Sequence, residues 1–155
     1  MPDPASRKIL LAFKALIDPI MGAQNTYIDL SDDEPLAANK RPAIALRIVS
    51  IDYDVAPDGM SQTMHRATLQ CDCFSDATVS QAIDQKNQET IARIMERIGT
   101  DPVLGGRLQD INATGSSGSE MDGADTGCAI LELAIIYFTP RYNYFTIVGH
   151  GGQTF

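Results

Sequence analysis

The amino-acid sequence predicts an α+β fold, in which a mainly antiparallel sheet has two helices packed beside it. Three observations predict this. Residues 125–139 form a long apolar segment of strand character, residues 62–74 alternate apolar and polar side chains, and two segments repeat apolar residues at helical spacing. The 155 residues fit one domain, which we place over residues 1–139, with an apolar C-terminal extension over residues 140–155.

The segment 125–139 is the one around which the other elements are expected to pack. Apolar residues fill both alternating faces, and Glu132 is its lone charge. It is too short to span a membrane, which takes about 20 apolar residues. A buried helix is the alternative, but Gly127 near the start, Pro140 at the end and many β-branched and aromatic residues favour a strand. Its two apolar faces indicate the middle of a sheet, or a strand covered on both sides.

A first helix is predicted over residues 3–18. Asp3 has the residue type of an N-cap, and Pro4 suits the first helical position. The residue before a proline avoids helical geometry, so Pro19 predicts an end near Asp18. The apolar residues of one helix face are Ile9, Ala12, Phe13, Leu16 and Ile17.

A second helix is predicted from about residue 78 to Gly99. Thr78 and Gln81 fit a capping box, and Gly99 is a C-terminal stop signal. The apolar stripe of this helix consists of Val79, Ile83, Ile91, Ile94, Met95 and Ile98.

Strands are predicted at residues 25–30, 42–53, 62–74 and 107–112, besides the central one. In the strand 62–74, Ala67, Leu69, Cys71 and Cys73 face inward, and the alternate residues face water. Residues 113–124 are rich in Gly and Ser and are predicted to be a mobile loop.

The overall charge argues against some partners. The formal net charge is −8 and the isoelectric point is about 4.5. Such an acidic surface argues against general binding to nucleic acid or to anionic membranes. The three cysteines lie in apolar strand patterns, so we expect reduced, buried thiols. The N-terminus has no signal-peptide pattern.

No catalytic, cofactor-binding or metal-binding residues are predicted. His65 shares a strand face with Cys71 and Cys73, but extended geometry puts His65 ~20 Å from Cys71, too far for one ion. We interpret His65 as an exposed residue near a strand start and the cysteines as core residues. The other histidine, His150, lies in a glycine-rich tail that does not hold it in a fixed geometry. We therefore expect no enzyme.

Several segments, in this order, resemble the tail terminator (tail completion) proteins of long-tailed bacteriophages. Residues 41–46, Arg-Pro-Ala-Ile-Ala-Leu, look like the strand after that family's N-terminal helix. The alternating strand ends in Phe74-Ser75-Asp76 and leads into the long helix. Residues 101–110 look like the family's turn after that helix, and residues 136–139 look like its closing strand. The resemblance covers residues 3–139.

The resemblance implies an α/β sandwich whose subunits form a homohexameric ring. Such a ring caps the tail tube, ends tail polymerisation, and contacts the head-completion or neck proteins, while DNA passes through its lumen without specific binding. The family implies no catalytic residues and no cofactor. It implies a structural protein of the virion, assembled in the host cytoplasm. The alternatives are another head–tail joining or neck protein, and a small ligand-binding or enzymatic α+β domain.

Two groups of residues are candidates for assembly. Arg47 and Glu132 are charges within apolar strand patterns, so each is expected to have a partner, either within the chain or on a neighbouring subunit, unless it is exposed. The tail is too apolar for a free terminus. Its residues Tyr142, Tyr144, Phe145 and Ile147 are expected at a subunit or ring interface, and an extra strand on the chain's own sheet is the alternative.

Three acidic residues are candidates for the lumen or the tube. Glu120, Asp122 and Asp125 lie in or next to the predicted loop 113–124. The loop is predicted to present their carboxylates to passing DNA, whose phosphates they would repel. The alternative is a solvated loop on the outer rim.

Overall fold

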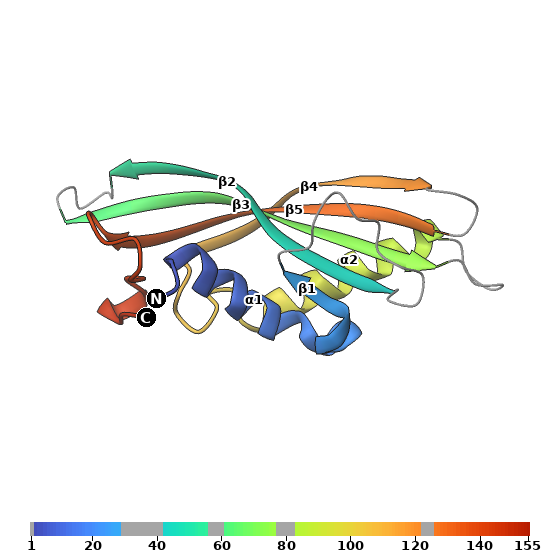
Figure 1. The fold of residues 1–155 in the computed structure, drawn as a ribbon, viewed down its shortest axis with the longest axis horizontal. Coiled ribbons are helices and arrows are strands. Elements are labelled where there is room, and N and C mark those ends of the chain that lie inside the picture. Colours follow the sequence, from blue (N-terminus) through green and yellow to red (C-terminus); the bar gives the residue numbers. More distant parts are fainter. Residues whose placement is uncertain (1, 29–41, 56–60, 77–82, 122–125) are drawn as a thin grey trace.

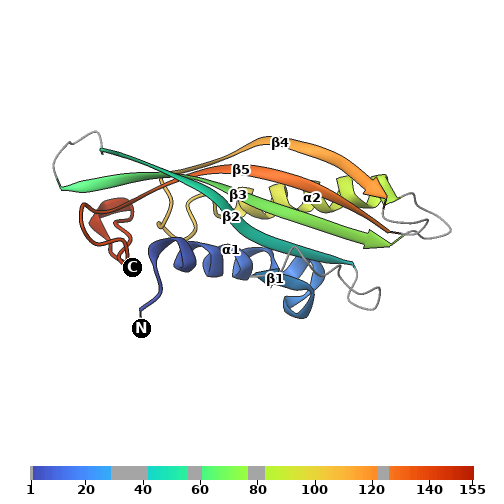
Figure 2. The same cartoon turned by 45° about the horizontal axis from the view of Figure 1, so that its top comes forward.

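The computed structural model describes residues 2–28, 42–55, 61–76, 83–121 and 126–155. They form one five-stranded sheet with the strand order β1-β2-β3-β5-β4. Both helices lie against the same face of this sheet (Figure 1). The second view shows the same two layers, with the chain ends below one end of the sheet (Figure 2). The predicted α+β class is confirmed.

The sheet is antiparallel except at one edge. The strands β2 (Ala43–Val55), β3 (Gln62–Asp76), β5 (Thr126–Pro140) and β4 (Asp110–Met121) pair antiparallel, whereas the short β1 (Thr26–Ile28) pairs parallel with β2. β5 has a partner strand on each side, as its two apolar faces predict.

The core lies between the sheet and the helices. Alternate residues of β3 and β5 point into it, because successive strand residues point to opposite faces. The fully or almost fully buried members from these two strands are Leu69, Cys71, Cys73, Ala129, Leu131, Leu133, Ile135 and Tyr137. On the other face, Ile130, Ile136 and Phe138 are only half-buried.

The first helix, α1 (Ala5–Met21), buries the predicted face through Ile9, Phe13 and Ile17, which are 0% exposed. The predicted Asp3 cap is wrong: Pro4 occupies the cap position and no side chain caps the helix. Instead, the Ala5 amide donates to the carbonyl oxygen of Tyr144 at 2.8 Å. A backbone group from the C-terminal segment thus satisfies an amide that a cap residue would otherwise bind.

The predicted end of α1 at Asp18 is also wrong, since the helix continues through Pro19 to Met21. Pro19 lies in the last turn, where the missing amide removes a single helical hydrogen bond. The Gly22 amide then bonds the Asp18 carbonyl oxygen at 2.7 Å, and the positive φ of Gly22 (88°) turns the chain toward β1.

The second helix, α2 (Ile83–Thr100), packs on β3 and β5. Its predicted stripe is confirmed at Ile91, Ile94 and Ile98, which are buried. The predicted capping box at Thr78 and Gln81 lies outside the described residues. The helix passes Gly99 and ends at Thr100, one residue beyond the predicted stop.

The largest difference between the structure and the sequence prediction is the length of β4. β4 spans Asp110–Met121, so most of the predicted loop 113–124 is strand. Its register with β5 shifts twice, between Ala113 and Gly115 and between Ser117 and Glu120. Gly and Ser are poor strand formers, but an edge strand needs only one partner, and the strongly apolar β5 supplies it. Bulges of this kind are typical of sheet edges.

Candidate assembly surface

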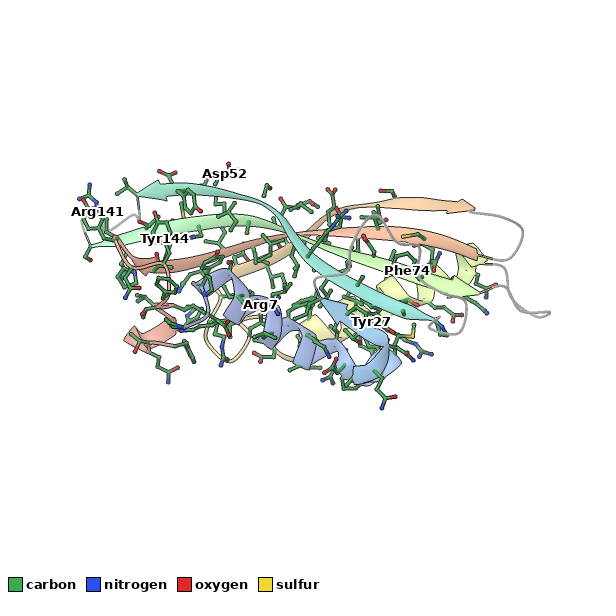
Figure 3. All side chains as sticks on the ribbon, viewed as in Figure 1. Arg7, Tyr27, Asp52, Phe74, Arg141 and Tyr144 are labelled. Atoms are coloured by element: carbon green, nitrogen blue, oxygen red, sulfur yellow. The ribbon has the colours of Figure 1, made fainter. Side chains whose placement is uncertain are left out.

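Aromatic side chains gather at one end of the sheet, where β2 ends, β3 begins and β5 ends. Tyr53, His65 and Tyr137 are direct cross-strand neighbours in the register of these three strands. Tyr144 joins them from the C-terminal segment and is labelled at this end in Figure 3. We call the group Tyr53, His65, Tyr137, Tyr142, Tyr144 and Phe145 the aromatic end.

His65 is the centre of this packing. Its ring stacks on Tyr137 at 4.6 Å between centroids and meets the edges of Tyr144 at 4.6 Å and Tyr53 at 5.0 Å. Tyr53 and Tyr144 stack on each other at 5.2 Å. Offset and edge-to-face contacts of this kind add to the stabilisation that burial itself gives. The C-terminal segment is thereby fixed to the sheet through Tyr144.

Two linked hydrogen bonds favour one tautomer of His65. His65 Nε2 lies 2.8 Å from Thr139 Oγ1, whose hydroxyl donates to the Pro140 carbonyl oxygen at 3.1 Å. In the tautomer that fits this arrangement, Nε2–H donates a hydrogen bond to the hydroxyl oxygen, and Nδ1 is the bare nitrogen. Nδ1 is buried and has no hydrogen-bond partner within the described residues. Burial lowers the pKa of the His65 imidazole from 6.5 to about 4.

This lowered pKa predicts a loss of stability in mild acid. Between pH 6.5 and about 4 the unfolded chain binds a proton at His65 that the folded chain does not. The stability that the folded protein gains from keeping His65 neutral is therefore complete above pH 6.5 and is lost as the pH falls toward 4. We expect a loss on the order of 2 kcal/mol in the free energy of unfolding.

Urea unfolding of the wild-type protein and of His65→Gln, measured from pH 7.5 to 4.5, tests this expectation. The carboxylates titrate alike in both proteins, so the difference between the two curves isolates His65. The difference should shrink as the pH falls. Parallel curves would contradict a buried neutral imidazole.

The outer side of the aromatic end is open to solvent. Tyr142 is 88% exposed, Tyr53 57%, Phe145 46% and Tyr144 39%. The Arg141 guanidinium lies 5.2 Å from the centre of the Tyr142 ring. A shallow hollow of about 290 Å³ between Tyr53, Val55, Thr63, Arg141 and Tyr144 adds concave surface there. Large apolar groups gathered at one place on a surface are typical of contact sites.

The C-terminal segment packs on its own domain, in part against expectation. Ile147 is 0% exposed and belongs to the core, so its predicted place at an interface is wrong. The Val148 amide bonds the Phe138 carbonyl oxygen at 2.8 Å, and Ile147 and Phe155 exchange two backbone hydrogen bonds. This resembles the alternative of an added strand, although only isolated bridges form. Tyr142, Tyr144 and Phe145 remain exposed, as an interface role requires.

Arg47 and Glu132 lie in one cross-strand row. Arg47 is paired in register with Gln70, and Gln70 with Glu132, on the face of the sheet away from the helices. Glu132 is exposed, so it is not the buried charge expected from its apolar surroundings. The reason is that α1 and α2 cover only the opposite face. Arg47 is half-buried, and its role at a subunit contact stays a prediction.

The predicted lumen carboxylates are only partly placed. Glu120 belongs to β4, next to the second register shift, and not to a loop. Its side chain, Asp122 and Asp125 lie outside the described residues. Their presentation to DNA stays a prediction.

Two of the three cysteines, Cys71 and Cys73, have the environment expected of core residues, whereas Cys128 is only half-buried. Cys71 and Cys73 are 0% exposed. Burial, with smaller contributions from Cys128 and Asp72, raises the pKa of Cys73 to about 12. Burial also raises the pKa of Cys71 well above its usual value. Such thiols are poor nucleophiles and poor metal ligands. Within the described part of the chain, no group of three His, Cys, Asp or Glu residues is placed to hold a metal ion.

The sequence interpretation missed the packing around His65, although a signal was present. His65 has the same parity as Ala67, Leu69 and Cys71, which were predicted to face inward. It is 2% exposed, because the tail places Tyr144 over what would otherwise be an open strand start. The position of Tyr144 depends on a contact between distant parts of the chain, so it is not visible in local sequence.

Comparison with known proteins gives no assignment. No protein-family model matches the chain, and no curated protein matches it. Neither described helix combines the length and the apolar character needed to cross a membrane.

Proposed function

We propose that this protein is a structural subunit of a phage virion, which caps the tail tube as a ring. The ring ends tail polymerisation and forms the interface to the head or neck proteins. The observation that carries this proposal is the exposed aromatic end on an otherwise acidic domain. Tyr53, Tyr142, Tyr144 and Phe145 expose far more apolar surface at one place than a solitary domain needs.

The architecture supports a surface for other proteins more than a reaction site. His65 is the buried polar group at the aromatic end, and it is enclosed by tyrosine rings. The neighbouring hollow is shallow and opens to solvent. Ligand pockets in contrast enclose most of a small molecule's surface. Aromatic residues and Arg, which gather here, are enriched where proteins contact each other.

The charge supports a passive role toward DNA. At a net charge of −8 per chain, a ring of these subunits would repel phosphates and let DNA pass without binding it. The partners of the proposed function are further copies of the chain, the tail tube protein and a head-completion or neck protein. The exposed C-terminal part of the aromatic end, Tyr142, Tyr144 and Phe145, is the surface that we assign to one of the last two.

Replacing exposed aromatic residues tests this assignment. We expect the double variant Tyr142→Ser and Phe145→Ser to bind tail tubes about tenfold or more weakly, because central aromatic residues dominate interface energies. The thermal midpoint should change little, since the Tyr142 side chain is 88% exposed and that of Phe145 is about half exposed. Co-sedimentation with tail tubes measures the binding.

Ala92→Ser, at an exposed position of α2, is the control and should bind as the wild-type protein does. If the double variant cosediments with tubes and joins heads as well as the wild-type protein does, the aromatic end is not the contact surface.

A further inference from the structure

A second hollow lies where α1, the turn before β4 and the end of the C-terminal segment meet. It measures about 430 Å³ and is lined by Lys8, Leu11, Ala12, Arg107 and Phe155. We call it the basic hollow. Leu11 is 39% exposed, although large apolar residues of a helix normally face the core. The hollow thus combines an apolar floor with two cations.

Neither cation has an ion pair with an Asp or Glu side chain within the described residues. Lys8 Nζ donates to the backbone oxygens of Phe145 at 2.7 Å and Phe155 at 3.2 Å. Arg107 Nη1 donates to the Leu104 carbonyl oxygen at 3.1 Å, and its guanidinium lies 4.4 Å from the centre of the Phe155 ring. These contacts hold both cations in place and leave N–H donors for a carboxylate.

The complementary surface lies on the free edge of β2. β1 pairs with β2 only from Ile44 to Leu46, so the rest of β2 has no described strand on its outer side. There Val49, Tyr53 and Val55 are 45%, 57% and 61% exposed. Asp52 and Asp54 are exposed too and alternate with Tyr53 and Val55, so the carboxylates flank this edge on the opposite face of the strand. We call Val49, Asp52, Tyr53, Asp54 and Val55 the edge strip. The ion pair of Asp54 with Arg66, at 3.8 Å, is long and solvent-exposed and therefore weak.

The edge strip is distinctive among the described residues. Over all the described residues, seven large apolar side chains are exposed, and three of these seven belong to the edge strip. The other four, Leu11, Tyr142, Tyr144 and Phe145, have Lys8 or Arg141 close to them in sequence, and of these four Tyr144 shares a hollow with Asp54 of the strip. The strip thus matches the basic hollow in both properties, with carboxylates for its cations and apolar groups for its floor.

We propose that the edge strip of one copy docks into the basic hollow of the next copy. The two surfaces belong to different parts of the chain, since the edge strip lies on β2, where Figure 3 labels Asp52, and the basic hollow is lined by residues of α1, of the turn before β4 and of the C-terminus. A contact between two different surfaces is heterologous, and repeated contacts of this kind close into a ring when the rotation permits. This inference rests on the proposed ring and names the surfaces that close it.

Charge reversal on each surface tests the contact. Leu11→Glu places a carboxylate on the floor of the hollow, and Asp52→Lys places a cation in the strip. Among the described residues, neither wild-type side chain has a hydrogen bond that the substitution would break. Each variant alone should weaken self-association by about tenfold or more, because like charges then meet across the interface. Both substitutions in one chain should restore it. Light scattering after gel filtration measures the mass against 16.8 kDa for one chain.

Arg93→Glu and Glu96→Lys, at exposed positions of α2, are matched controls and should leave the ring mass unchanged. Circular dichroism melts confirm that each variant is folded. Rings that persist in both single variants, or that the double variant fails to restore, overturn this contact and leave the proposed function standing. A wild-type protein that stays monomeric, alone and with tail tubes, overturns the proposed function itself.

Discussion

A chain shortened after Thr139 is expected to lose its cooperative fold. The missing segment carries Ile147, which is fully buried in the core, and Tyr144, which covers His65. Its Tyr144 carbonyl also caps the first amide of α1. The loss of a core side chain, the exposure of the aromatic cluster and the loss of a helix cap each lower the free energy of unfolding. Together their cost is comparable to the roughly 5–15 kcal/mol by which domains are stable. The sequence alone predicts the opposite, because it places this segment outside the domain.

Urea unfolding followed by circular dichroism measures this effect. Ile147→Ala isolates the core contact, and we expect it to lower the free energy of unfolding by about 2–4 kcal/mol. Tyr142→Ala is the control in the same segment, and its side chain is 88% exposed, so it should change little. A shortened chain that unfolds at the wild-type urea concentration would show that the segment is not part of the domain.

Phe13→Ala is expected to lower the free energy of unfolding by about 3–5 kcal/mol. Phe13 is 0% exposed on α1, and the core around it includes residues of both helices and of the sheet. Its removal leaves a cavity where no neighbouring backbone can collapse without shifting a helix.

Leu11→Ala is the control on the same helix, two residues away and 39% exposed, and it should cost less than about 1 kcal/mol. Equal losses in the two variants would contradict the packing of α1. A loss of self-association in Leu11→Ala without a loss of stability would agree with the basic hollow.

The parts of the fold that the sequence predicts are those with a strong local pattern. The alternation in β3 and the apolar stripes of α1 and α2 each follow from residues within one element. β4 was missed beyond Asn112, because Gly115, Ser116 and Ser117 are strand residues only through their pairing with β5. The run of Arg47, Gln70 and Glu132 across three strands depends on register, which bulges shift and which composition does not reveal.

The candidate surface was predictable only in part. The apolar character of Tyr142, Tyr144 and Phe145 indicated a contact, and their exposure agrees with one. The basic hollow was not predictable, since Lys8, Arg107 and Phe155 come from three distant parts of the chain. Surfaces formed by such residues appear only once the fold is known.

Electron microscopy of tail tubes, polymerised with and without this protein, tests the central claim most directly. We predict that tubes formed in its presence carry a ring with a central opening at one end, and that their growth stops there. Tubes of unchanged length with bare ends, at protein concentrations well above that of tube ends, would contradict the proposal that the protein caps the tail.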